Sequence, residues 1–158
     1  MKQLLAGDRR EAAADVLRLA GRHEEAIELY LACGLHHGAG ASLRALGRHD
    51  EAICHLTLTP QDGPHYREAC REVAAASIAR ESLEPFVARF ILPFADSGPR
   101  SDQEVPAFLD LAELYWAAGD RRRADRCLTL VLRLVPRHET AQLLRLTWRT
   151  EQEREKRG

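Results

Sequence analysis

The feature of the sequence that most constrains the fold is an internal repeat near the N-terminus. Residues 16–27 read VLRLAGRHEEAI and residues 42–53 read SLRALGRHDEAI, so eight of twelve positions are identical. The starts of the two copies, at positions 16 and 42, define a 26-residue period. Glycines recur at nearly even intervals, two to a period, at Gly7, Gly21, Gly34 and Gly47. Because glycine commonly follows the end of a helix, each period predicts two short helices with a glycine turn after each. We therefore expect residues 1–59 to form a stack of short antiparallel helices.

The residues after the repeated glycines fit the start of a further helix. Acidic pairs stand there in both copies, Glu24-Glu25 and Asp50-Glu51. Negative charge is favourable at the positive end of a helix dipole. Ala26 and Ala52 come next, and such small residues allow neighbouring helices to approach closely.

The composition favours helices and a single domain. Ala, Leu, Arg and Glu are strong helix formers and are abundant in the sequence. The chain has 158 residues, 45% of them hydrophobic, so we expect residues 1–158 to form one all-α domain with its own core. Lys and Arg number 23 against 24 Asp and Glu, a formal net charge of −1. This balance gives no global attraction to nucleic acid or to an anionic membrane.

No part of the sequence predicts an export signal or a membrane segment. Residues 1–10 lack the apolar core of a signal peptide, and no stretch reaches the roughly 18 apolar residues that span a bilayer. We therefore expect a cytoplasmic protein without a membrane partner. The cysteines form no C-x2-C pair and stand beside apolar residues, so we interpret them as reduced, buried thiols. They are Cys33, Cys54, Cys70 and Cys127.

The middle of the chain predicts a helix pair outside the repeat pattern. Two prolines and a glycine within residues 59–64 end the first group of helices. Apolar residues then recur at helical spacing, which predicts a divergent helix pair over residues 64–94. In its second helix we expect Ser82 as the N-cap, Pro85 in the first turn and Pro93 where the helix ends or kinks.

The last third of the sequence carries a recognisable motif. We expect residues 95–103 to form the softest joint, and Ser101-x-x-Glu104 then has the form of a capping box at the start of a helix. The following residues match the pattern W-x2-L-G-x2-Y, A-x3-F, P, with Phe, Ala and Leu in place of W, G and F. They are Phe108, Leu111, Ala112, Tyr115, Ala124, Leu128 and Pro136. Residues 102–138 therefore resemble a tetratricopeptide repeat.

The resemblance implies a right-handed superhelical solenoid of antiparallel helix pairs, with nine or ten helices in all. The 26-residue repeats are similar in kind to the compact helix pairs of clathrin-type and other tetratricopeptide-like solenoids. Residues 139–156 would form the capping helix. In the resembled family the turn position of His23 and His49 usually holds an aromatic residue, so we interpret both histidines as packing residues.

The family also implies a binding surface. The first helix of each pair lines a concave face that binds an extended peptide or a helix, and Leu109, Glu113 and Trp116 lie outside the core stripe of that helix. We expect Trp116 to be the anchor for a protein or peptide partner, with packing on a following helix as the alternative. The acid Glu113 does not suit a ligand that ends in a carboxylate.

Four arginines follow this helix at a turn. Arg121, Arg122, Arg123 and Arg126 stand where the helix dipole disfavours cations. They indicate either a solvated face or a basic rim for an acidic partner, and nucleic acid is the less favoured partner at this net charge.

A regulatory site is the alternative function. The second repeat is rich in histidine, and Cys33-x2-His36 has the spacing of a zinc ligand pair. His37, His49 and His55 could complete it, yet no second close pair does so. The sequence has no G-x-S-x-G, H-E-x-x-H or P-loop motif. We therefore expect no catalytic residue, no cofactor and no metal, and keep ligand or metal sensing as the alternative to partner binding.

The N-terminal end carries one further expectation. Residues 1–6 offer only a short helix before Gly7, whereas terminal repeats usually have a polar cap. This predicts either a chain excised from a longer protein or self-association through the N-terminal end.

Overall fold

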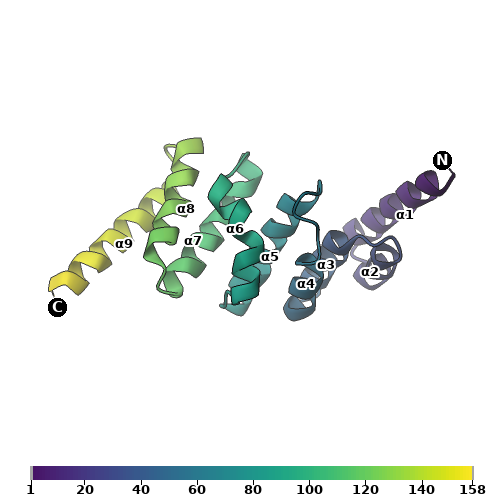
Figure 1. The fold of residues 1–158 in the computed structure, drawn as a ribbon, viewed down its shortest axis with the longest axis horizontal. Helices are drawn as coiled ribbons and strands as arrows, with labels where there is room; N and C mark the ends of the chain where they lie inside the picture. The colour runs from purple at the N-terminus through teal and green to yellow at the C-terminus, as the bar shows by residue number, and fades with distance from the viewer. Residues whose placement is uncertain (1, 158) are drawn as a thin grey trace. The chain divides into compact units, whose positions relative to one another are not determined.

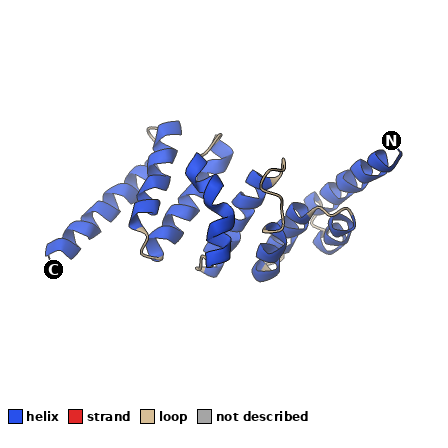
Figure 2. Ribbon diagram, in the orientation of Figure 1, coloured by secondary structure: helices blue, strands red, loops and turns tan. Residues whose placement is uncertain are grey.

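The computed structural model describes the backbone of residues 2–157 and the side chains of residues 9–157. Within the described backbone the protein is entirely helical, with no strand (Figure 2). The helices are α1 (Lys2–Leu19), α2 (His23–Ala32), α3 (His36–Ala45), α4 (His49–Leu56), α5 (Tyr66–Arg80), α6 (Pro85–Ser97), the 3-10 helix η1 (Asp102–Glu104), α7 (Val105–Ala117), α8 (Arg121–Leu134) and α9 (Glu139–Arg157). The prediction of an all-α fold is confirmed.

The chain divides into two compact units, Met1–Ile91 and Leu92–Gly158. The helices of each unit can be followed along the chain by their colours in Figure 1. In the first unit α1 packs on α2, α2 on α3, α3 on α4, and α5 on both α3 and α4. In the second unit α7 packs on α8 and α8 packs on α9. Within the first unit α1 to α5, and within the second α7 to α9, each helix is thus a neighbour of the one before it in the sequence.

One type of turn recurs between the helices. Gly21, Gly34, Gly47 and Gly119 all have positive φ, from +70° to +85°. After each glycine the next amide donates to the carbonyl oxygen five residues earlier, over 2.8 to 2.9 Å. This is the Schellman pattern, in which glycine takes up the left-handed conformation at no steric cost. The tetratricopeptide-like segment therefore has the same turn as the 26-residue repeats.

Gly7 does not form such a turn. It lies within α1, which continues to Leu19, so the prediction of a turn here is wrong. A glycine inside a helix costs only about 1 kcal/mol relative to alanine and does not by itself end the helix. The side chains of residues 1–8, on which the expected self-association depends, lie outside the described residues.

Small residues let the helices of the first unit approach closely. Ala26 and Ala52 are fully buried, as the repeat predicts. In α3 the buried glycines Gly38 and Gly40 face large neighbours. A Cβ atom added to Gly38 would lie 2.5 Å from Tyr30 Cδ1, and one added to Gly40 would lie 2.5 Å from Leu56 Cδ2. The absence of side chains at these two positions is what lets the helices on both sides of α3 pack against it.

Helix α6 differs from its prediction at both ends. It begins at Pro85, which confirms Pro85 in the first turn, but Ser82 is too far upstream to be the N-cap. It also continues past Pro93 to Ser97, so residues 95–97 are helical and not part of a loop. Pro93 is exposed, whereas Phe94 and Ala95 beside it are buried. Burial of these neighbours outweighs the hydrogen bond that proline cannot make.

The core of the second unit follows the tetratricopeptide-like positions. Phe108, Leu111 and Ala112 of α7 are fully buried, as are Ala124 and Leu128 of α8. The start of α7 departs from the expected capping box.

At that start the buried carboxylate of Glu104 accepts a hydrogen bond from the amide of Arg100 at 2.7 Å, and the Ser101 side chain makes no capping bond. A turn of 3-10 helix precedes α7, which places the glutamate against the amide of the residue before the serine.

Candidate functional site

The predicted anchor Trp116 lies on α7 and is half-buried. Its indole stacks on Trp148 of α9, with ring centroids 4.6 Å apart and planes inclined by 4°. The guanidinium carbon of Arg121 lies 4.6 Å from the centroid of the Trp116 ring and forms a cation–π contact. Arg121 also pairs with Glu155 of α9. These contacts fasten α9 to the end of α7, so Trp116 packs on a following helix, the alternative that the sequence left open.

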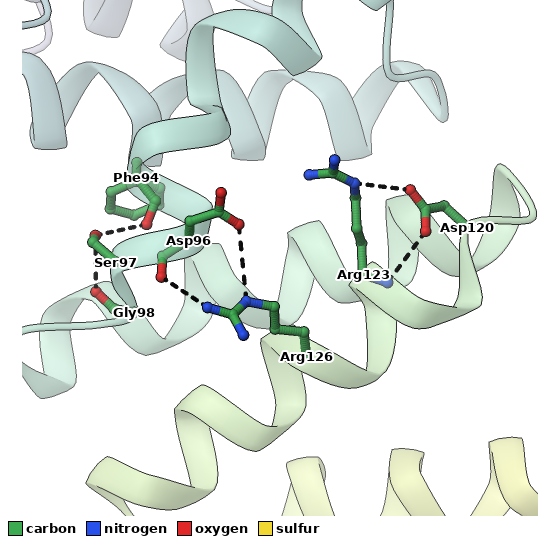
Figure 3. A network of polar contacts seen from close by, with 7 residues as sticks. All are labelled: Phe94, Asp96, Ser97, Gly98, Asp120, Arg123 and Arg126. Carbon is green, nitrogen blue, oxygen red and sulfur yellow. Dashed lines mark hydrogen bonds and ion pairs between the residues drawn. The ribbon is translucent and has the colours of Figure 1, made fainter.

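The arginines at the start of α8 are largely paired with acids. Arg123 lies 3.1 Å from a carboxylate oxygen of Asp120, and Arg126 lies 3.8 Å from one of Asp96 (Figure 3). Asp120 is also the N-cap of α8 and accepts from the amide of Arg123 at 3.2 Å. The exposed Arg122 makes no ion pair with any described residue. Three of the four arginines are thus paired with acids, and of the basic rim that the sequence offered as one alternative only Arg122 has no acidic partner among the described residues.

A hollow of about 510 Å³ lies beside this cluster, between the end of α6 and the start of α8. Its wall is formed by Asp96, Asp120, Arg122, Arg123 and Arg126. The three arginines exceed the two aspartates by one charge, and the free charge is that of Arg122.

Leu109 and Glu113 lie on the same face of α7 as Trp116, because they are spaced four and three residues apart. Leu109 is half-buried and Glu113 is exposed. The structure thus brings the predicted residues of α7 onto one face, and Arg121 contacts this face at Trp116. The Trp116 indole also packs on Trp148 of α9, so only part of it is available to a partner.

A second polar site lies in the first unit, where sequence reasoning did not place one. A cavity of about 400 Å³ is lined by side chains of α1, α2, α3 and α5. Four carboxylates, two arginines and two histidines form most of its wall. With neutral histidines, and with Glu72 paired to Arg44, the three other carboxylates against two arginines leave a formal charge of −1, which favours a cation.

Two histidines stack in this cavity. The rings of His37 and His65 lie 3.8 Å apart between centroids, with planes inclined by 10°. Burial lowers the pKa of His37, and the neighbouring His65 lowers it further, while Glu68 opposes the shift. His65 Nδ1 lies 3.7 Å from a carboxylate oxygen of Glu68. The Glu11 carboxylate completes a group whose ligand atoms all lie within 4.8 Å of one another.

The opposite wall of the cavity is held by a hydrogen-bond network. Tyr30 is almost fully buried, and its hydroxyl donates to Asp15 and accepts from Arg18 Nε at 3.0 Å. Burial is the main cause of the raised pKa of Tyr30. Glu72 is held by an ion pair with Arg44. These contacts fix the wall through α1, α2, α3 and α5 together.

The zinc ligands considered from the sequence do not form one group. His36 lies against His55, with 3.3 Å between their Nδ1 atoms, whereas His37 faces His65. Among the described side chains, only Glu11, His37 and His65 form a set of three close enough to hold a metal. Glu11 stands one repeat period before His37, and His65 stands slightly more than one period after it. The repeat period is the sequence signal that could have found this group, because residues one period apart lie on neighbouring layers of a helical stack and can come close together.

The predicted packing of His23 and His49 and the predicted burial of the cysteines are each met only in part. His23 and His49 are half-buried, and the Nδ1 atom of each is buried without a hydrogen-bond partner among the described residues. The four cysteines form no disulfide among the described residues; Cys70 and Cys127 are buried, Cys33 is half-buried and Cys54 is exposed. Expected burial is therefore wrong for Cys54. Burial raises the pKa of the Cys127 thiol to about 12.

Comparisons with known proteins find no relative that would assign a function to these sites. No protein-family model, no curated protein and no solved structure matches the chain. Within the described part of the chain, no helix combines the length and the apolar character needed to cross a membrane. The resemblance to tetratricopeptide repeats rests on the residues of 102–138 quoted above.

Proposed function

We propose that the protein is a non-catalytic helical-repeat module, similar to tetratricopeptide repeats, that binds a protein or peptide partner. The observation that carries the proposal is the recurrence of one closed glycine turn, at Gly21, Gly34, Gly47 and Gly119. Helices joined by equal turns and packed on their sequence neighbours make a stack, and stacked repeats present an extended surface to other chains. A right-handed superhelical solenoid is the arrangement that this proposal includes.

The proposed contact surface consists of the α7 face and of the hollow between the end of α6 and the start of α8. Leu109 supplies apolar area, and Glu113 and Arg122 are both exposed. Arg122 is the charge to which an acidic partner would respond, because its three neighbours are paired with acids. Trp116 contributes the edge that Trp148 and Arg121 leave uncovered.

Arg122→Glu tests the proposal against a matched change on the same helix. Arg133 is also exposed on α8 and makes no ion pair with the described residues, so Arg133→Glu gives the same charge change away from the hollow. A photo-crosslinker at position 122, compared with one at 133, identifies the protein that touches each site. We expect a specific adduct from position 122 alone, and weaker capture of that protein by Arg122→Glu, most clearly at low salt.

Two further variants separate this surface from the first unit. Trp116→Ala removes the uncovered edge of the indole together with its stacking on Trp148, and we expect it to weaken binding of the crosslinked partner roughly thirtyfold. The double variant His36→Ala with His49→Ala should leave binding unchanged. The proposed surface would be contradicted if Arg122→Glu and Arg133→Glu weakened partner binding equally, or if only the double histidine variant weakened it.

A further inference from the structure

Three side chains in the first unit converge in the way that metal ligands do. Glu11 comes from α1, His37 from the first turn of α3, and His65 from the residue before α5. Their ligand atoms all lie within 4.8 Å of one another. In a tetrahedral zinc site, bonds of about 2.0–2.1 Å to nitrogen and oxygen place the ligand atoms about 3.3 Å apart. Because the two imidazole rings are stacked in the described structure, at least one ring must turn about its side-chain torsions for both to aim a nitrogen at one ion.

We propose that Glu11, His37 and His65 bind one divalent transition-metal ion, and that Zn²⁺ is the ion this set suits. Two imidazoles and one carboxylate are the protein donors that zinc accepts readily, and the set includes no thiolate. The proposal goes beyond partner binding and does not depend on it, because the partner surface belongs to the second unit.

Glu68 prepares His65 for this role. Its carboxylate lies 3.7 Å from His65 Nδ1. At that distance the contact is longer than a hydrogen bond; closer approach of the carboxylate to Nδ1 on metal binding would hold the proton there and leave Nε2 to bind the metal. Glu68 is thus a positioning residue.

The surroundings fit a cation with one open coordination position. Apart from Glu72, which is paired with Arg44, the wall carries one more carboxylate than arginines. Tyr30, Asp15 and Arg18 form a fixed network on it. Three protein ligands leave a fourth position, and the cavity of about 400 Å³ gives room there for water or a small ligand.

Calorimetric titration of Zn²⁺ into chelator-treated protein tests the site. We expect one equivalent to bind the wild type, and Glu11→Gln, His37→Gln and His65→Gln each to weaken binding by about 100-fold or more, since loss of an outer-sphere partner alone costs 10–100-fold. His36→Gln and His49→Gln are matched controls, because both residues begin neighbouring helices of the same unit. Both controls should bind zinc as the wild type does. Glu68→Gln should have a smaller effect than loss of a ligand.

Two measurements on the wild type remain informative if a variant fails to fold. Co²⁺ in the site should give visible d–d bands without thiolate charge transfer, and zinc should shift the imidazole nuclear magnetic resonance signals of His37 and His65 first. Absence of saturable binding at one equivalent would overturn the proposal. So would a cobalt–thiolate band, or equal loss of affinity in the control variants, because each would place the metal elsewhere.

Discussion

Gly40 offers a sharp test of how closely the helices of the first unit pack. Replacement of a glycine inside a helix by alanine normally stabilises a protein by about 1 kcal/mol. At Gly40 the new Cβ would lie 2.5 Å from Leu56 Cδ2 and 3.3 Å from the carbonyl oxygen of Ala52. Leu56 is fully buried and cannot swing into solvent. Overpacking of a core costs about 1–3 kcal/mol, so we expect Gly40→Ala to destabilise the protein by about 1 kcal/mol net.

The sign should reverse when Leu56 is truncated. Leu56→Ala removes the side-chain atoms that the new methyl group would strike, and by itself costs about 2–5 kcal/mol through the cavity it leaves. In that background Gly40→Ala fills part of the cavity and gains helix propensity, which together stabilise by about 1 kcal/mol. The two changes should therefore be coupled by about 2 kcal/mol in a double-mutant cycle.

Urea unfolding of the four proteins, followed by far-ultraviolet circular dichroism, measures the cycle. Ala13→Gly is the calibration, because Ala13 is exposed in the interior of α1 and reports the local cost of glycine without a packing change. If Gly40→Ala stabilised the wild type by as much as Ala13→Gly destabilises it, the close approach of α4 to α3 would be refuted. Additive effects of Gly40→Ala and Leu56→Ala would refute it equally.

The turn, the core and the α9 contacts of the second unit give further predictions. Gly119→Ala should destabilise by about 1–2 kcal/mol in urea unfolding, because φ is +85° there and nothing else lies within 4 Å of the new methyl group. Burial raises the pKa of Cys127 and of Tyr115 to about 12. The folded state therefore holds these protons more tightly than the unfolded state does. Their contribution to the free energy of unfolding is fully present below pH 9 and is lost as the pH rises toward 12. Thermal melts across that pH range should show a falling Tm, and a constant Tm would contradict this prediction. Trp148→Ala should cost about 3–5 kcal/mol because the indole is buried, whereas Arg121→Ala should lower Tm far less because its ion pair is exposed.

The turns could be predicted from the sequence because each requires a residue with positive φ after the end of a helix, and glycine meets this requirement. Only glycine takes up positive φ without a steric cost, so Gly21 and Gly47 mark helix ends. The same reasoning fails for Gly7 and Pro93, which are tolerated inside helices. At Pro93 burial of the neighbouring apolar residues decides the outcome, and that burial depends on tertiary packing.

The candidate sites could be predicted only in part because their side chains meet across long stretches of sequence. The arginines 121 to 126 are visible as a cluster, but the acids that neutralise two of them lie 30 and 34 residues away. Trp116 was recognisable as a large residue off the core stripe, whereas its contact with Trp148 depends on how α9 packs. The charges of residues close in the sequence were therefore a poor guide to the net charge of this surface in the folded protein.

The repeat itself explains how distant polar residues come together in the first unit. Glu24 and Asp50 are equivalent positions, and the sequence accounts for both as favourable charges at a helix start. In the structure each also faces an arginine later in the chain: Arg48, the residue before α4, lies 3.9 Å from Glu24, and Arg80, at the end of α5, lies 2.7 Å from Asp50.

Both acids are exposed, so each bridge adds little stability by itself. Their recurrence nevertheless shows that residues about one period apart occupy successive layers and can be linked from layer to layer. Glu11, His37 and His65 follow the same rule, because each stands about one period after the one before it. A metal held by them would join α1, α3 and the start of α5, three elements that no turn connects directly, and its binding would stabilise the first unit as a whole.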